Sequence, residues 1–386
     1  MRDEMRTYPP GGQMTRRSLL GLMGASGVLA AACAPAAGVP QPAAPAAPSQ
    51  PAQPAWQKEW DELVAAGRKE GLVVYDITRS NSGARAAIEH FKKAIPGIEV
   101  EQTTSAAAST LAEQVQKEQQ AGVFSWDVLF GGSLSHFYAN GSLAPLKPML
   151  LRPDVLDNAG WRDGFDAGWV DREKRWGYAF QLHVDPGVWV NGDQVGPDEI
   201  IKPTDLLNPK WRGRIVMADP RVVGFGYVPL TVLRLRHGQE SMDRLLTEQK
   251  VILNRDTRQI TEQMVRGQHA IAFGVVKTVL EEFKKEGLGK NIRPLPMLGI
   301  DLGKIMWLPK QVPHPNAAKV FINWMLGKEG QEAWCKAVVT NSRRTDVPVI
   351  DPAVFPRAGM EFQSGNSEEG ARELDRTVEI AKELLK

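Results

Sequence analysis

Apolar and polar residues follow one another along the chain in an order that predicts strands alternating with helices. The apolar run Leu72–Tyr75 is typical of a buried strand, the polar stretch Thr78–Ser82 of a turn, and residues 83–93 have helical spacing. The same order returns, with strands expected at 97–101 and 126–130 and helices expected at 111–120 and 134–140. Such alternation favours an α/β fold with a mostly parallel sheet covered on both faces. Because 386 residues exceed the usual size of one hydrophobic core, we expect two lobes.

The segment Asp205–Tyr227 predicts a strand, a loop and the start of a helix. Arg214–Ala218 has the composition of a short buried strand, which Asp219-Pro220 ends because proline cannot donate to a sheet ladder. The loop Val223–Tyr227 contains two glycines and leads into a helical pattern. Backbone N–H groups at such a helix N-terminus suit an anion, although an ordinary strand–loop–helix corner has the same pattern.

Near the C-terminus, apolar residues recur at helical spacing. They are Ala371, Leu374, Val378, Ala381 and Leu385, with charged residues between them. This stripe predicts a helix that docks on the globular body. A helix that binds a membrane partner is the alternative.

Residues 1–33 have the features of an export signal. Thr15–Leu20 contains a twin-arginine pattern, and the apolar segment after it is too short to span a bilayer permanently. Leu29–Cys33 resembles a lipoprotein processing site with Cys33 as the acylated residue, although the leucine lies one position further from the cysteine than usual. Cleavage without acylation would give a soluble secreted protein. Residues 34–55 are rich in alanine and proline and predict an extended tether.

The composition argues against several classes of function. Lys and Arg total 47 and Asp and Glu total 45, without a long basic run, so we expect no nucleic-acid partner. The two cysteines, Cys33 and Cys335, cannot form a disulfide framework, and Cys335 is expected to be a buried structural thiol. The six histidines lie singly, and no enzyme or phosphate-loop motif occurs. We therefore predict no cofactor, no metal and no enzymatic activity; a secreted hydrolase is the alternative because catalytic triads assemble in space.

Several segments, in order, resemble type 2 periplasmic solute-binding proteins of ABC importers, in the ferric-iron, thiamine and phosphonate-like branch. They are Leu72–Ser80, Asp127–Ser133, Gly187–Asn191, Asp205–Tyr227 (with P-K-W-R-G-R-I-V-M-A-D-P), His314–Leu326 and Gly327–Gln331. The resemblance covers most of the chain after the tether. It implies two lobes, each a mostly parallel sheet flanked by helices, joined by a hinge of at least two crossovers, expected near Tyr178–Asp185 and near Leu298–Leu308. We assign 56–181 and 300–328 to lobe I, and 182–299 and 329–386, with the C-terminal helix, to lobe II.

In such folds the ligand lies beyond the carboxyl ends of the strands, where the turns supply hydroxyl, amide and backbone N–H donors. The expected ligand-binding residues are Thr78, Ser80, Asn81, Gly132, Ser133, Tyr178, Gly224, Gly226, Tyr227 and Arg258. Plain helix caps are the alternative for the hydroxyl and amide residues. Arg258, with Arg79 and Arg255, would form a carboxylate or phosphate clamp or else be solvated.

Aromatic residues gather around the first expected crossover between the lobes. They are Trp161, Trp169, Trp176, Tyr178 and Trp189. They would wall a ligand cleft or pack beneath the hinge, because pockets are lined mainly by apolar and aromatic side chains.

The resemblance also argues against ferric iron. Iron-binding members of the family carry an adjacent tyrosine pair after a strand that corresponds here to the start of Ala270–Lys277, which contains no tyrosine. No two of the five tyrosines in the chain are adjacent. Lys277 instead brings a cation to this place, which suits an anionic ligand.

Together these features predict an exported lipoprotein on the outer face of the cytoplasmic membrane. We expect a monomer that captures a small anionic ligand by hinge closure and delivers it to an ABC permease. A neutral or zwitterionic organic ligand walled by tryptophan is the second interpretation of the ligand. A lipoprotein that senses a ligand for a membrane partner is the alternative function.

Overall fold

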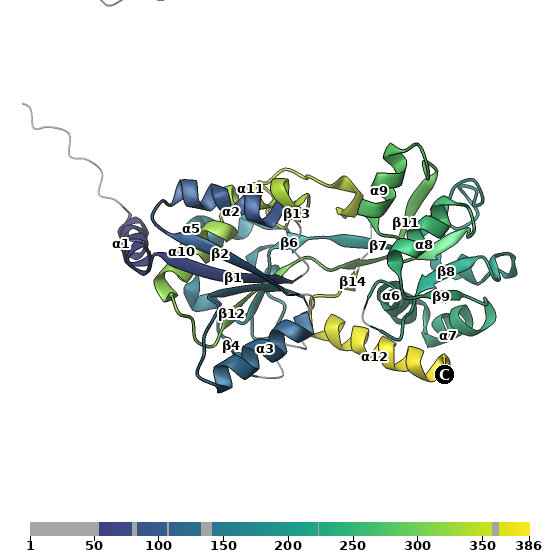
Figure 1. Ribbon diagram of the computed structural model, residues 1–386, viewed down its shortest axis with the longest axis horizontal. Coiled ribbons are helices and arrows are strands. Elements are labelled where there is room, and N and C mark those ends of the chain that lie inside the picture. The colour runs from purple at the N-terminus through teal and green to yellow at the C-terminus, as the bar shows by residue number, and fades with distance from the viewer. Residues whose placement is uncertain (1–53, 79–82, 106–107, 133–140, 223, 357–362) are drawn as a thin grey trace, which may run out of the picture. The chain divides into compact units, whose positions relative to one another are not determined.

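The computed structural model describes residues 54–78, 83–105, 108–132, 141–222, 224–356 and 363–386 (Figure 1). Within these residues the chain forms two large β-sheets with helices packed on them, so the predicted α/β fold with two sheet-containing lobes is confirmed. None of the helices in the described part of the chain is both long and apolar enough to cross a membrane.

The first sheet has the strand order β2-β1-β3-β12-β4, and β5 also pairs with β12. Its strands are β1 (Leu72–Thr78), β2 (Glu99–Ser105), β3 (Val128–Gly131), β4 (Leu143–Ala144), β5 (Gly177–Ala179) and β12 (Ile305–Pro309). β1 runs parallel to β2 and β3, whereas β12 runs antiparallel to β3, β4 and β5. β3 and β12 are buried along their whole length, which explains their continuous apolar sequences.

Helices pack on both faces of the first sheet. They are α1 (Ala55–Glu70), α2 (Gly83–Ala94), α3 (Ala108–Gln120), α10 (Pro315–Leu326) and α11 (Lys328–Val338). On one face an aromatic core forms, in which the Phe91 ring meets the rings of Phe321 and Trp324 edge-on at 5.2 Å. Leu111 of α3 packs with Leu129 on the other face, because successive residues of β3 point to opposite sides.

The structure places the boundary between the lobes later than the predicted residue 328. α11 packs on α2, and its Trp334 and Cys335 lie in the first core, so the first lobe extends beyond that residue. β13 (Asn341–Ser342) then pairs with β6 (Gln181–Leu182) in a separate two-stranded sheet. Burial raises the pKa of the Cys335 thiol to about 12, as expected for a structural cysteine and not for a nucleophile.

The second sheet has the strand order β14-β11-β7-β10-β8-β9. Its strands are β7 (Val184–Asn191), β8 (Ile215–Ala218), β9 (Ile252–Asn254), β10 (Ile271–Phe273), β11 (Ile292–Asp301) and β14 (Gln363–Ser364). β8 is parallel to β9 and β10, whereas β7 is antiparallel to β10 and β11. The predicted strand at 214–218 is therefore present, and it ends before Asp219.

The helices of the second sheet are α6 (Tyr227–His237), α7 (Gln239–Glu248), α8 (Thr257–Val265), α9 (Lys277–Lys285) and α12 (Glu368–Leu384). α12 is the C-terminal helix that the apolar stripe predicts, and Figure 1 shows it beside α6. Its Leu374 and Val378 are buried in the second core, and the Thr377 hydroxyl receives a hydrogen bond from the Thr231 hydroxyl at 2.9 Å. Arg234 of α6 forms an ion pair with Glu373.

Short elements complete the described chain. They are α5 (Pro153–Leu156) and the 3₁₀ helices η1 (Lys147–Met149), η2 (Asn158–Gly160), η3 (Phe165–Gly168), η4 (Pro203–Leu207), η5 (Pro209–Trp211) and η6 (Pro352–Val354).

The loop between β8 and α6 depends on the absence of a side chain at Gly226. A Cβ atom there would overlap the carbonyl oxygen of Ala218, the last residue of β8. A Cβ atom at Gly224 would meet no atom closer than the Val222 carbonyl oxygen at 4.0 Å. The close approach at Gly226 thus sets the first turn of α6 directly against the end of β8.

We expect Gly226→Ala to lower the free energy of unfolding by about 1–3 kcal/mol, because the strand end and the helix must separate to admit the methyl group. Gly224→Ala is the matched control and should leave stability nearly unchanged. Urea denaturation followed by far-UV circular dichroism measures both variants. Equal stability of the two variants would contradict the close packing at Gly226.

Candidate functional site

Strand direction brings the connection from β5 to β7 and the connection from β11 to β12 to one edge of each sheet; a further connection between the lobes runs from α11 to β14. β1, β3 and β5 end at the edge of the first sheet where β12 begins. β8, β9, β10 and β11 end at the edge of the second sheet where β7 begins. We call these the hinge edges. Because ligands of α/β folds bind beyond the carboxyl ends of strands, the hinge edges are the candidate site.

On the first hinge edge, Lys304 contacts the end of β1. Its Nζ donates to the carbonyl oxygen of Thr78 and to the Thr78 Oγ1, the latter at 3.3 Å. The backbone N–H of Lys304 donates to Gln181 Oε1 at 3.1 Å. Thr78 is only 4% exposed. Lys304 is the cationic side chain that contacts it on this edge.

Two buried polar atoms near Lys304 have no hydrogen-bond partner within the described residues. Asp76 Oδ2 accepts from Thr103 at 2.6 Å and from Ser105 at 3.1 Å, whereas Asp76 Oδ1 accepts none. Gln181 Nε2 likewise has no acceptor. Burial raises the pKa of Asp76, and the hydrogen bonds and the nearby Lys304 oppose that shift. Unpaired buried polar atoms are costly, so this edge is suited to receive a polar group.

On the second hinge edge, two arginines share one carboxylate. Arg221 Nε donates to Asp219 Oδ1 at 2.8 Å, and Arg255 Nε donates to Asp219 Oδ2 at 3.1 Å. The Asp219 side chain is 2% exposed, whereas the Arg255 side chain is 75% exposed. Hydrogen bonds from Arg221 first, and then from Arg255, lower the pKa of Asp219 to about 2. The group carries a net positive charge and leaves Arg255 open to solvent.

Helix N-termini meet the same edge of the second sheet. α8 is capped by Asp256, whose Oδ1 accepts from the backbone N–H groups of Arg258 and Gln259. Neither α6, which follows Gly226, nor α9 has a side-chain cap. Lys277, the first residue of α9, forms an ion pair with Asp351. The cation that the sequence places beside the ligand is therefore already matched by a carboxylate.

The structure brings about half of the predicted site residues to the hinge edges. Thr78 and Gly132 lie on the first edge, and Gly224, Gly226 and Tyr227 on the second. Cys33, Arg79, Ser80, Asn81 and Ser133 lie outside the described residues. The guanidinium of Arg258 lies 3.6 Å from Glu282 of α9, and its side chain is 66% exposed.

Tyr178 is a core residue, which corrects its predicted place in the cleft wall. Its side chain is fully buried, and its hydroxyl donates to the carbonyl oxygen of Phe165 at 3.0 Å. The rings of Trp161 and Trp169 pack edge-on against the Tyr178 ring, with distances between ring centroids of 5.3 and 5.2 Å. These tryptophans therefore pack beneath the hinge, which is one of the two interpretations that the sequence leaves open.

Sequence reasoning missed Lys304 and Gln181. Both lie on the predicted crossovers, Lys304 directly before β12 and Gln181 at the start of β6. Their position next to a crossover was the available signal, but nothing in the local pattern distinguishes Lys304 from the other basic residues. Its partner, Thr78, is 226 positions away.

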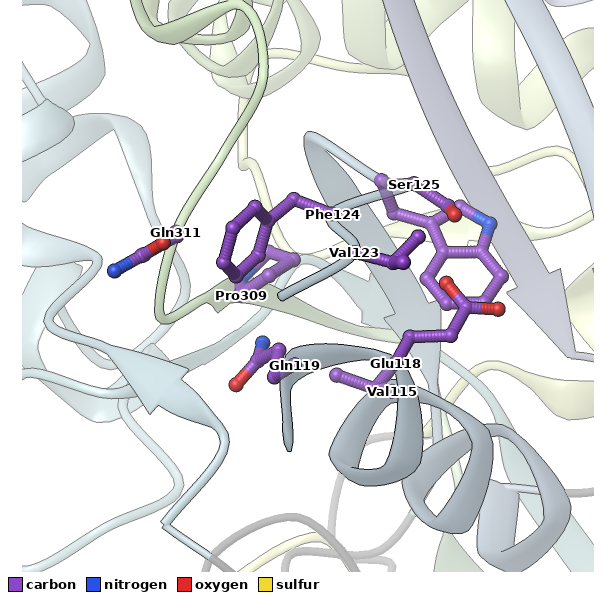
Figure 2. Close-up of a pocket in the computed structure, with 9 residues that line it drawn as sticks. Val115, Glu118, Gln119, Val123, Phe124, Ser125, Pro309 and Gln311 are labelled. Atoms are coloured by element: carbon purple, nitrogen blue, oxygen red, sulfur yellow. The ribbon is translucent and has the colours of Figure 1, made fainter. Parts of the chain in front are cut away.

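A pocket at the opposite end of the first sheet is too small for a ligand. It is lined by the C-terminal part of α3, the loop before β3, Pro309 at the end of β12 and Gln311 just after it. Figure 2 shows Phe124 and Pro309 on one side of it and Val115 and Glu118 on the other. Its volume of about 10 Å³ corresponds to about one water molecule.

Comparisons with known proteins agree with the fold. A family model described as bacterial extracellular solute-binding protein matches residues 75–332. Iron-bound HitA from Pseudomonas aeruginosa is 19% identical with a TM-score of 0.61, covering 81% of this chain and 99% of its own. The Mannheimia haemolytica ferric iron-binding protein A, in an open conformation, is 15% identical with a TM-score of 0.62. The match covers 81% of this chain and 98% of that protein. A Trichodesmium protein in complex with iron and citrate is 16% identical with a TM-score of 0.61. The match covers 82% of this chain and 98% of that protein.

A curated relative, an uncharacterised protein of Haemophilus influenzae, is 26% identical over 179 residues. That match covers 44% of this chain, which thus spans about half (51%) of the relative's length. The solved structures are similar to this chain in fold, and their descriptions name bound iron or ferric-iron binding.

The low pKa of Asp219 predicts a pH-dependent contribution to stability. Because this pKa is lower in the folded chain than its ordinary value of 3.8, the stabilisation is complete above that value and is lost as the pH falls through about 2. We expect Asp219→Asn to lower the free energy of unfolding by about 2 kcal/mol at pH 7, and the difference from the wild type to shrink between about pH 4 and pH 2. Urea titrations across this range measure it, with the exposed Asp198→Asn as the control. A difference that stays constant down to pH 2 would contradict the shared carboxylate.

Proposed function

Because the chain belongs to the bacterial extracellular solute-binding protein family, we propose that it captures a small anionic ligand between its hinge edges and delivers it to an ABC permease. Proteins of this family bind small ligands and work with membrane permeases. The family is bacterial and extracellular, so the chain is an exported binding protein. The anionic character of the ligand is the part of the proposal that depends on this chain's own residues.

One observation carries the anionic assignment, namely that cationic and N–H donor groups lie on both hinge edges. The first edge presents the Lys304 ammonium and the unpaired Nε2 of Gln181. The second presents the exposed guanidinium of Arg255 and the N-terminus of α6, which has no side-chain cap. Guanidinium groups and helix N-termini both favour carboxylates and phosphates. An anion that contacts both edges would gain contacts that either edge alone cannot provide.

In this mechanism the ligand changes a conformational equilibrium, and no bond is made or broken. The ligand contacts both edges only when the lobes close, so its differential affinity stabilises the closed state. The permease would then recognise the closed form. A sensing role, in which a membrane partner responds to the closed form without transport, uses the same binding step.

Ferric iron is the second candidate cargo, because several similar solved structures are described as ferric-binding proteins. Against it, Tyr75, Tyr178 and Tyr227 are all buried, and no cluster of three or more His, Cys, Asp or Glu residues suited to a metal occurs in the described residues. The Trichodesmium protein is described with iron and citrate together. The binding test therefore compares an iron-free anion with the same anion carrying ferric iron.

We expect a small anion to raise the melting temperature of the exported protein. The probes are methylphosphonate, glucose 6-phosphate, citrate, thiamine, glucose and ferric citrate. Ligand at a hundred times its Kd adds about 2.7 kcal/mol of stability, which shifts melting by several degrees. A shift by glucose or thiamine alone would contradict an anionic ligand, and a shift by ferric citrate but not by iron-free citrate would identify a metal cargo.

Lys304→Gln should weaken binding of the responding anion at least tenfold, because it removes the cationic group of the first hinge edge. Lys310→Gln, an exposed lysine six residues further along, is the matched control and should bind normally. Arg258→Gln tests the clamp that the sequence predicts. Unchanged binding in Lys304→Gln would exclude the first hinge edge as the anion site.

We also propose that Cys33 is acylated and anchors the protein to the outer face of the cytoplasmic membrane through the tether 34–55, as a monomer. Cys33→Ser should move the protein from the membrane fraction to the soluble fraction, because the lipid attachment site is lost. Fractionation with detergent phase partitioning measures this. A wild-type protein that is already soluble would indicate cleavage without acylation.

A further inference from the structure

A second cavity lies where the edge of the first lobe meets the end of the second sheet. It has a volume of about 280 Å³. Its lining includes Trp169 and Ala179 from the first lobe, and Asp301 and Ser364 from the ends of β11 and β14. We call it the hinge cavity. It lies on the hinge edges at the ends of β5 and β11, and its lining includes none of Thr78, Lys304, Arg221 and Arg255.

Two buried groups of opposite charge line the hinge cavity. Arg343 is 8% exposed and Asp301 is 7% exposed. The Arg343 guanidinium donates to the carbonyl oxygens of Ala167 at 2.6 Å and Arg162 at 3.2 Å. Asp301 Oδ1 accepts from the backbone N–H groups of His183 and Gly303, each at 3.0 Å. These contacts hold both charged groups in place.

The two groups act on each other electrostatically but form no ion pair: burial raises the pKa of Asp301, and its hydrogen bonds from His183 and Gly303 and the charge of Arg343 oppose that rise. Within the described residues, neither Arg343 nor Asp301 belongs to an ion pair. Buried charges are expensive unless they have a partner of opposite sign. The indole Nε1 of Trp169, which also lines the cavity, is buried without an acceptor. The cavity walls therefore carry a cation and an anion that form no ion pair, and an N–H donor without an acceptor.

We propose that the hinge cavity binds a compact zwitterion of the amino-acid class. Its carboxylate would contact Arg343, with the Trp169 N–H as a further donor, and its ammonium would contact Asp301. Guanidinium groups bind carboxylates bidentately, and the opposite charges of one ligand satisfy both walls. Ligand pockets typically measure roughly 300–1,000 Å³, so a cavity of this volume takes a small ligand.

The position of the hinge cavity gives such a ligand a role in the hinge. The cavity is lined by the end of β5 in the first sheet and by the ends of β11 and β14 in the second. A ligand that contacts both sheets has different affinities for the open and closed arrangements, so it shifts the equilibrium between them. The zwitterion would therefore tune capture of the anion by Lys304 and Arg255 and not replace the anion there; this role rests on the proposed function.

Calorimetry on the purified exported protein tests the proposal, with glycine, L-alanine and L-serine as probes. Acetate and ethylammonium, each with one of the two charges, are the matched comparison ligands. We expect at least one amino acid to bind tenfold or more tightly than both comparison ligands. Absence of amino-acid binding at millimolar concentrations, or binding no tighter than acetate, would overturn the proposal.

Asp301→Asn keeps the side-chain oxygen that accepts from His183 and Gly303 but removes the charge. It should weaken amino-acid binding at least tenfold and leave acetate binding unchanged, whereas Asp198→Asn should change neither. If Asp301→Asn does not fold, Ala167→Leu fills the cavity from an exposed position and should abolish amino-acid binding at an unchanged melting temperature. Loss of amino-acid binding in Lys304→Gln, with binding retained in Ala167→Leu, would place the amino acid beside Lys304 and not in the hinge cavity, and it would overturn the proposal while leaving the solute-binding function intact.

Discussion

The pairing of β12 with β3 is the constraint on which the rest of the structure depends. β12 follows the second sheet in sequence but lies inside the first, antiparallel to β3, β4 and β5, and it is fully buried there. The chain must therefore leave the first sheet and return to it. It crosses once more after α11, because β14 and α12 belong to the second lobe. Strand direction brings the crossings before β7 and after β11 to the carboxyl ends of the parallel strands, so the hinge and the candidate site lie together.

This arrangement explains why polar groups are concentrated at the crossovers. The apolar faces of the sheets do not cover the polar groups at the strand ends. Specific hydrogen bonds and ion pairs satisfy these groups. Lys304 contacts Thr78, Gln181 accepts from Lys304, and Asp219 holds two arginines. These contacts leave an excess of positive charge and several unused donors. The proposed anionic ligand would match the positive groups, whereas Asp76 Oδ1 on the first hinge edge would suit a hydrogen-bond donor of that ligand.

Residues of the same type either pack in the core or line the hinge cavity, and the aromatic cluster around Tyr178 shows the difference. Tyr178, Trp161 and Phe165 form a closed aromatic cluster whose single hydroxyl is satisfied internally. Trp169 belongs to the same cluster but reaches the hinge cavity, where its indole nitrogen has no acceptor. Arg343 is likewise both structural, through two backbone carbonyls, and open to the cavity. Burial alone therefore does not separate structural residues from residues that could bind a ligand.

The sequence alone determined the elements whose causes are local. The apolar runs of β1 and β8, the proline that ends β8, the helical stripe of α12 and the glycines before α6 all act over a few residues, so their patterns are readable without a structure. The tertiary structure alone decided which polar groups meet. The partners of Lys304 and Lys277 lie 226 and 74 positions away, and α11 joins the first lobe because its Trp334 fills the core there. A tyrosine in a short strand, such as Tyr178, has the same local pattern whether it faces a cleft or a core. Strand order and crossover position settle that choice, and both arise from contacts between distant segments that no local periodicity encodes.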